Sequence, residues 1–134
     1  MVSKNHSTGM RGVYLVAAEL SRLGFIATVI SRNALGADIL VADHRYKRVY
    51  SVQVKTNARS FSFWLLNKHA KDLKSKSHRY VFVNLKEKET EYFIVPSEVV
   101  SDKMYVSKRK PSPFYSFAYE DAKKYENKWS IFKS

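Results

Sequence analysis

The 134-residue sequence has no cysteine, four glycines and three prolines. Because cysteine is absent, the chain can form neither a disulfide nor a thiolate metal site. No long tract rich in glycine, proline or serine suggests a linker, and we find no internal repeat. A chain of this length is typical of one domain, which we expect to span residues 1–134.

Long apolar runs are also missing. The longest reach about half of a bilayer span, so we expect no transmembrane helix. The first ten residues, MVSKNHSTGM, are polar and lack the apolar core of a signal peptide. We therefore expect a cytoplasmic protein that does not contact a membrane.

Acidic residues are scarce: 12 Asp and Glu stand against 24 Lys and Arg, a formal net charge of +12. The segment from Asp43 to Tyr80 has ten basic and two acidic residues, so it carries +8 of that total. Such a charge distribution favours a polyanionic partner, most often a nucleic acid. The alternative is a basic surface that only keeps the protein soluble.

The most informative stretch is GADILVADHRYKRVYSVQVKTN, from Gly36 to Asn57. An apolar run over 37–42, a polar turn over 43–48 and an alternating run over 49–56 predict a β-hairpin. Alternation places Gln53 and Lys55 on one face of the second strand. Pairing around the turn would bring Asp38, at the start of the first strand, close to both. Gly36 suits a tight backbone approach just before Asp38.

These three side chains combine a carboxylate, an amide oxygen and an ammonium. Carboxylate and carbonyl oxygens are the ligands that Mg²⁺ prefers. The Lys55 ammonium can hold a phosphate oxygen or orient an attacking water. Separately, each side chain also fits an ordinary structural role, as a turn cap, an exposed strand residue or a charged edge residue.

The pattern D-x14-Q-x-K, preceded by a helix with an Arg-Gly pair and a glutamate, resembles the PD-(D/E)xK nuclease superfamily. It is most similar to the small Holliday-junction-resolvase-like and restriction-endonuclease-like members, over roughly residues 10–85. The resemblance implies an α/β fold, a restriction-endonuclease-like domain with a central mixed sheet of four or five strands flanked by helices. It also implies a Mg²⁺-dependent endonuclease that acts on DNA, with Mn²⁺ as a substitute, with no small-molecule cofactor and possibly as a homodimer.

The resemblance also assigns roles to residues. Asp38, Gln53 and the backbone carbonyl of Val54 are the expected metal ligands, and Lys55 is the expected catalytic lysine. Most relatives have a carboxylate at the position of Gln53, and many carry a glutamate where this chain has Val13. Glu19, one to two turns later on the helix, is the candidate replacement, although it can instead form a surface ion pair with Arg22 or Arg11.

The remaining expectations concern DNA contacts and the other elements. We expect a helix from about Met10 to Leu23, capped by Ser7 or Thr8 and ended by Gly24. The strand expected over 61–65 would add a third strand to the first hairpin. Further strands are expected over 25–30, 80–85 and 91–95, helices over 98–105 and 119–125, and a basic loop over 106–113. His69 and His78 are candidate general bases, although such histidines are more often simply exposed. The expected nucleic-acid contacts are Arg11, Arg32, Asn33, Arg59, Lys68, Lys71 and Lys74.

Two other functions are consistent with the same residues. Val13 and Gln53 lower the number of acids in the expected site, which fits a nuclease-like DNA-binding module with weakened catalysis. A basic surface also fits RNA, although no RNA-recognition motif with paired aromatic residues is present.

Overall fold

A computed structural model describes residues 4–30 and 36–133. Its first element is helix α1 (Lys4–Arg22), which buries Gly12, Val13, Val16 and Leu20. The helix ends in a Schellman motif, in which Gly24 adopts φ 95° and the Phe25 N–H donates to the Leu20 carbonyl at 3.0 Å. This confirms the predicted end of the helix. Its predicted start near Met10 was wrong, because Ser7 and Thr8 lie inside the helix rather than capping it.

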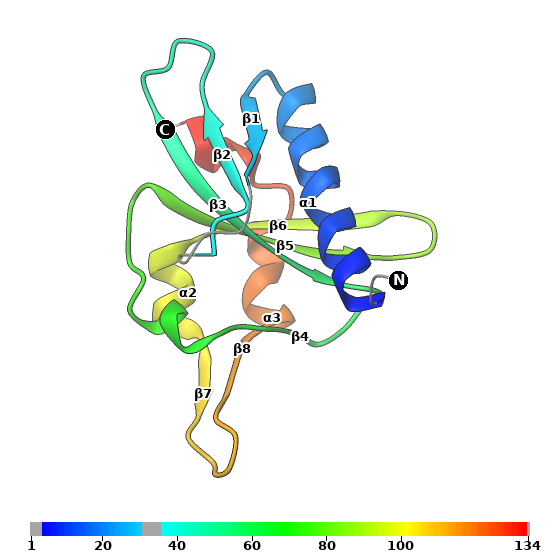
Figure 1. Cartoon of the computed structure of the whole chain (residues 1–134), viewed down its shortest axis with the longest axis vertical. Coiled ribbons are helices and arrows are strands. Elements are labelled where there is room, and N and C mark those ends of the chain that lie inside the picture. The colour runs from blue at the N-terminus through cyan, green and yellow to red at the C-terminus, as the bar shows by residue number, and fades with distance from the viewer. Residues whose placement is uncertain (1–3, 31–35, 134) are drawn as a thin grey trace.

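The central sheet has five strands in the order β1-β2-β3-β5-β6, as Figure 1 shows. Only β3 and β5 are parallel, and the other neighbours are antiparallel. This confirms the mixed sheet flanked by helices and both predicted hairpins. The strand bounds are β1 Ile26–Val29, β2 Ile39–Ala42, β3 Val49–Asn57, β5 His78–Leu85 and β6 Thr90–Pro96.

Two apolar clusters cover the two faces of this sheet. On one face, Val52 and Val54 of β3 pack with α1 and with the C-terminal 3-10 helix η3 (Trp129–Lys133). On the other face, Tyr80 and Phe82 of β5 pack under the remaining elements. Side chains alternate along β3, so Gln53 and Lys55 point to the second face, opposite to Val52 and Val54. In the register with β5, Gln53 lies beside Tyr80 and Lys55 beside Phe82.

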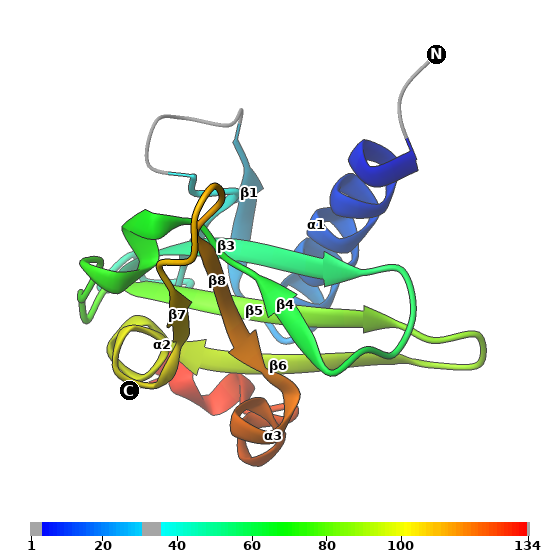
Figure 2. The ribbon, with the colours of Figure 1, turned by 90° about the horizontal axis from the view of Figure 1, so that it is seen from below.

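A second, three-stranded sheet with the order β4-β8-β7 covers that second face (Figure 2). We expected β4 to extend the first hairpin, but it pairs with β8, more than 50 residues later. The expected basic loop over 106–113 was also wrong in part, because β7 and β8 form an antiparallel hairpin there. The bounds are β4 Phe63–Leu65, β7 Tyr105–Ser107 and β8 Phe114–Ala118.

Short helices complete the second face. The predicted helix over 98–105 ends early, at Lys103, because Tyr105 already belongs to β7. None of the helices in the described ranges combines the length and the hydropathy of a membrane span. The bounds are α2 Ser97–Lys103, α3 Tyr119–Ala122, and the 3-10 helices η1 Lys68–Lys71 and η2 Lys123–Tyr125.

Candidate active site

The candidate site lies where β3 extends beyond the end of β2. Their last pair is Ile39 with Val52, whereas β3 continues along β5 to Asn57. Asp38 sits at this end of β2, and its N–H donates to the Val52 carbonyl at 2.8 Å. Its carboxylate accepts a 2.8 Å hydrogen bond from the Val54 N–H. Asp38 is therefore fixed against the strand edge, both by its backbone and by its side chain.

The structure brings the three predicted side chains together. A pocket of about 170 Å³ is lined by Gly36, Asp38, Gln53, Val54, Lys55 and Asn67. Gln53 is only 8% exposed, so it is not the solvated strand residue of the alternative interpretation. Gly36 has φ 77°, and a Cβ there would lie 3.0 Å from the Gln53 Nε2. The expected close backbone approach before Asp38 is therefore present, and it packs against the Gln53 amide.

Asp38, Gln53 and Val54 supply only oxygen donors for a cation. In an extended strand the N–H and C=O of one residue point to the same edge, so the Val54 carbonyl faces the Asp38 side. A carboxylate, an amide oxygen and a peptide oxygen match the hard-ligand preference of Mg²⁺ or Mn²⁺. Within residues 4–30 and 36–133, no group of three His, Cys, Asp or Glu side chains is placed to hold a metal. The oxygen donors of Asp38, Gln53 and Val54 are therefore of the type that such a cation prefers, and together they carry one formal negative charge.

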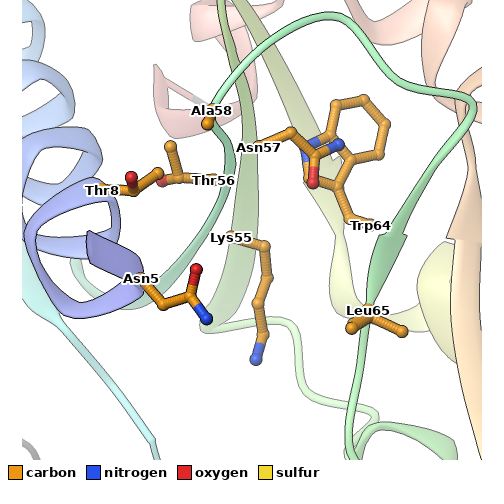
Figure 3. Close-up of a pocket in the computed structure, with 8 residues that line it drawn as sticks. All are labelled: Asn5, Thr8, Lys55, Thr56, Asn57, Ala58, Trp64 and Leu65. Carbon is orange, nitrogen blue, oxygen red and sulfur yellow. The ribbon is translucent and has the colours of Figure 1, made fainter. Parts of the chain in front are cut away.

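Lys55 also lines a larger pocket of about 400 Å³, which Figure 3 shows. Asn5 and Thr8 of α1 form one wall, and Trp64 and Leu65 of β4 form the opposite wall. The Lys55 side chain projects between these walls (Figure 3). Its ammonium therefore reaches a space that can admit a phosphate group.

Asn57 anchors the wall formed by β4. Its Nδ2 donates to the Phe63 carbonyl at 2.9 Å and to the Asn84 Oδ1 at 3.1 Å. Asn84 in turn donates to the buried Glu91 at 3.2 Å. This network fixes β4 relative to β3 and β5, and so fixes the width of the Lys55 pocket.

Val13 is one of the residues of α1 that line a pocket together with Asp38. A small pocket of about 80 Å³ is lined by Asp38 and Val54 of the sheet region and by Asn5, His6, Gly9, Met10 and Val13 of the helix. Helix α1 lies close here because Gly12 has no side chain. A Cβ at Gly12 would be 1.9 Å from the Thr56 Oγ1. The position at which the resemblance to nucleases would place an acid is thus occupied by a valine.

Glu19 is not brought to this pocket. It follows Val13 by six residues, which places it about 9 Å further along the helix and roughly a third of a turn around it. Its carboxylate instead accepts hydrogen bonds from the Arg22 guanidinium at 2.8 and 3.0 Å. The alternative interpretation of Glu19, an ion pair with Arg22, describes its position, and the structure offers no support for a catalytic role.

Arg11 and Glu19 both lie near Tyr92 of β6, because both affect its pKa. Burial raises the pKa of Tyr92, the nearby Glu19 raises it further and Arg11 lowers it. Arg11 precedes Gly12 and is exposed. It therefore lies toward β6, on the other side of α1 from the pocket that Val13 lines.

The two candidate general bases differ. His78 is buried, and its Nδ1 lies 2.6 Å from the Ser51 Oγ. Burial lowers the pKa of His78 from 6.5 to about 4, and the neighbouring Arg79 adds to this effect. His69 is exposed on η1. Neither histidine lines a pocket with Asp38, so the structure supports a packing role for His78 and a surface role for His69.

The predicted DNA contacts are distributed over several elements. Lys71 donates to the Ser101 carbonyl at 3.0 Å, and Lys74 forms a 3.3 Å ion pair with Asp102. Arg59 is exposed on the loop before β4, and Lys68 is exposed at the start of η1. Arg32 and Asn33 lie outside the described residues.

Two site residues were not anticipated from the sequence. Asn67 lines the Asp38 pocket, and its Oδ1 caps η1 by accepting from the His69 N–H at 2.9 Å. An asparagine directly before a short helix is a capping signal, which was available in the sequence. His6 lines the small pocket with Asp38, and no sequence signal pointed to it.

Comparison with known proteins addresses the fold. A Holliday junction resolvase from the archaeal hyperthermophile Archaeoglobus fulgidus superimposes with a TM-score of 0.54 and 13% sequence identity. The chain has a nuclease-like fold. The similarity covers 86% of this chain and 87% of the resolvase. No protein-family model and no curated protein sequence matches the chain.

Proposed function

We propose that this protein is a metal-dependent endonuclease that hydrolyses phosphodiester bonds in DNA. The observation that carries the proposal is the shared pocket of Asp38, Gln53, Val54 and Lys55 on the open edge of β3. The nuclease-like fold supports it, because the similar archaeal protein is a Holliday junction resolvase. The net charge of +12 supports a polyanionic substrate.

Each residue has a task in this proposal. Asp38, oriented by the Val54 N–H, would hold Mg²⁺ or Mn²⁺ together with the Gln53 and Val54 oxygens. Such a cation polarises a phosphodiester and favours ionisation of water. Lys55 projects into the larger pocket, where its ammonium would hold a phosphate oxygen and stabilise the charge that develops during attack. The attacking water would approach in line with the bond that breaks.

Cleavage of labelled duplex, branched and single-stranded DNA with Mg²⁺, Mn²⁺ or EDTA tests the proposal. We expect metal-dependent cutting by the wild type and its loss in Asp38→Ala and Lys55→Ala. Lys88→Ala is the matched control, because Lys88 is an exposed lysine in the β5–β6 turn that lines neither the Asp38 pocket nor the Lys55 pocket. RNA of the same sequence serves as the competing substrate. Absence of cutting by the folded wild type under every metal condition would refute an endonuclease.

A second candidate function is a DNA-binding module with weakened catalysis. It is favoured by Val13, which lines the pocket with Asp38 and leaves it with a single carboxylate, and by the neutral Gln53. This module would bind DNA in EDTA as tightly as in Mg²⁺. Lys55→Ala would then remove one phosphate contact from the DNA interface and have no further effect on DNA binding.

A further inference from the structure

The outer face of the second sheet carries a row of exposed aromatic rings. Phe63 on β4 and Phe114 on β8 have ring centroids 5.5 Å apart. Phe61 extends the row at 4.9 Å from Phe63, and Tyr105 of β7 extends it at 6.1 Å from Phe114. The rings come from three strands, so the row is a product of the sheet and not of one sequence segment.

Strand alternation explains why these rings point outward. Trp64 and Phe117 are paired in the register and are buried against the central sheet. Their neighbours Phe63 and Leu65 therefore point to the opposite face. Phe61 is 45% exposed and Tyr105 is 58% exposed. The inner layer belongs to the core, whereas Phe61, Tyr105 and Phe114 of the outer face are exposed and Phe63 between them is half-buried.

The aromatic row is continuous with the candidate active site. Leu65 belongs to the outer face and also lines the Lys55 pocket (Figure 3). The Asn57 side chain, which lines the same pocket, holds the Phe63 carbonyl at 2.9 Å. A strand of nucleic acid with a phosphate beside Lys55 would therefore meet the aromatic row within a few nucleotides.

The surroundings of the row carry charge of one sign. The β7–β8 hairpin, which projects beyond the rest of the chain in Figure 1, carries Lys108, Arg109 and Lys110, all exposed. Residues 105–118 include no acid. Aromatic side chains beside basic ones are the combination by which proteins bind single strands, because bases stack on the rings while cations follow the phosphates.

We propose that this aromatic row stacks with unpaired bases of a nucleic-acid strand. The substrate class would then be DNA with a single-stranded segment, such as a flap, an overhang or an opened duplex. The inference rests on the proposed function in placing those bases beside the scissile phosphate. The binding itself does not require catalysis.

Fluorescence anisotropy in EDTA tests the stacking without cleavage. The probes are a labelled single strand, the same sequence as a duplex, and an abasic single strand of equal length and charge. The variants are Phe61→Ala, Tyr105→Ala and their combination. Tyr14→Ala is the matched control, because Tyr14 is 59% exposed but lies on α1.

A lost base–aromatic stack weakens single-strand binding by about 5-fold to 100-fold. We expect at least about 5-fold for each single variant and more than about 10-fold for the double variant. Binding of the abasic strand and of the duplex is expected to change less than about 2-fold, because phosphate contacts remain. Tyr14→Ala is expected to behave as the wild type, and circular dichroism checks that every variant is folded.

Three outcomes would overturn the inference. In one, the variants bind the single strand as well as the wild type does. In another, the abasic strand loses as much affinity as the normal strand, which would mean that the rings support only phosphate binding. In the third, sedimentation shows a dimer that Tyr105→Ala dissociates while single-strand affinity is unchanged, so a second copy covers the rings. Base-dependent binding in EDTA, combined with no cutting by the wild type in Mg²⁺ or Mn²⁺, would refute the endonuclease proposal and leave the stacking inference in place.

Discussion

The carboxylate of Asp38 accepts a 2.8 Å hydrogen bond from the backbone N–H of Val54. The bond satisfies a backbone donor of β3 just beyond the last residue pair of β2 and β3, Ile39 with Val52. Asp38 therefore has two roles that a substitution can separate. One is to satisfy a backbone donor, and the other is to place a negative charge in the pocket.

Asp38→Asn is expected to separate these roles. The asparagine oxygen can still accept from Val54, so we expect the free energy of unfolding to stay within about 1 kcal/mol of the wild type. Asp38→Ala leaves the donor unpaired and is expected to cost about 1–3 kcal/mol. Both variants are expected to lose metal-dependent cleavage. Urea denaturation and the cleavage assay measure the two effects, and full activity of Asp38→Asn would exclude a role for the charge.

Val13→Glu is expected to strengthen metal binding. Val13 lines a pocket with Asp38 and Val54, so a glutamate there adds a second carboxylate to the site. If the cation binds tenfold more tightly, saturating Mn²⁺ stabilises the variant by about 1.4 kcal/mol more than it stabilises the wild type. The measurement is the metal-induced change in unfolding free energy, and cleavage is expected to increase with it.

Tyr14→Glu is the control for this gain. It adds the same charge one residue later, at an exposed position outside the pocket. An equal metal-induced stabilisation of both glutamate variants would show that the effect is one of general charge and that Val13 does not face a cation site.

His78 predicts a pH dependence of stability. Burial lowers its pKa to about 4 in the folded chain, against 6.5 when exposed. Below pH 6.5 the unfolded chain binds a proton that the folded chain does not, so stability falls as the pH decreases from 6.5 to about 4. The loss attributable to His78 is about 3 kcal/mol over that range.

Denaturation of His78→Gln over the same pH range checks this assignment. The variant is expected to have a shallower loss of stability than the wild type, whereas His69→Gln, at an exposed position, is expected to follow the wild type. Parallel pH profiles for wild type and His78→Gln would assign the acid sensitivity to other groups.

Two glycines of α1 are expected to respond oppositely to alanine. At Gly12 a Cβ would clash with Thr56 at 1.9 Å, so Gly12→Ala is expected to destabilise the fold by about 1–3 kcal/mol. A Cβ at Gly9 meets nothing within 4 Å, and alanine favours the helix by up to about 1 kcal/mol. Chemical denaturation measures both. Equal effects of the two substitutions would contradict the close approach of α1 to β3 at Gly12.

Lys68 and Lys71 are expected to contribute differently to DNA binding. Lys71 already donates to the Ser101 carbonyl, whereas Lys68 is exposed, with no hydrogen bond or ion pair found among the described residues. If Lys68 contacts a phosphate, Lys68→Ala reduces the slope of log affinity against log salt by about 1. Lys71→Ala is expected to reduce it less. Salt titrations of binding compare the two, and an unchanged slope for Lys68→Ala would remove it from the interface.

Local sequence patterns were sufficient for some elements. The alternation from Val49 to Thr56 predicted β3 and the shared face of Gln53 and Lys55, because strand geometry fixes that relationship within one segment. Gly24 predicted the end of α1, because it alone can adopt the positive φ of the terminal turn at low cost. Two apolar runs on either side of a charged turn predicted the hairpin of β5 and β6.

Other elements depend on contacts between distant segments. The pairing of β4 with β8 joins residues more than 50 positions apart, so no local pattern indicated it. The turn of the β7–β8 hairpin lies in a stretch rich in lysine and proline, whose composition favours a loop. The row of aromatic rings exists only because these strands meet.

The sequence by itself determined the charge of the protein, the residue types of the candidate site and the order in which they occur. Only the tertiary structure decided which residues of α1 line a pocket with Asp38. Val13 and Glu19 belong to the same helix, and a helical pattern alone does not fix its rotation against a sheet. The close contact of Gly12 with Thr56 fixes that rotation, which turns Val13 toward Asp38 and leaves Glu19 paired with Arg22.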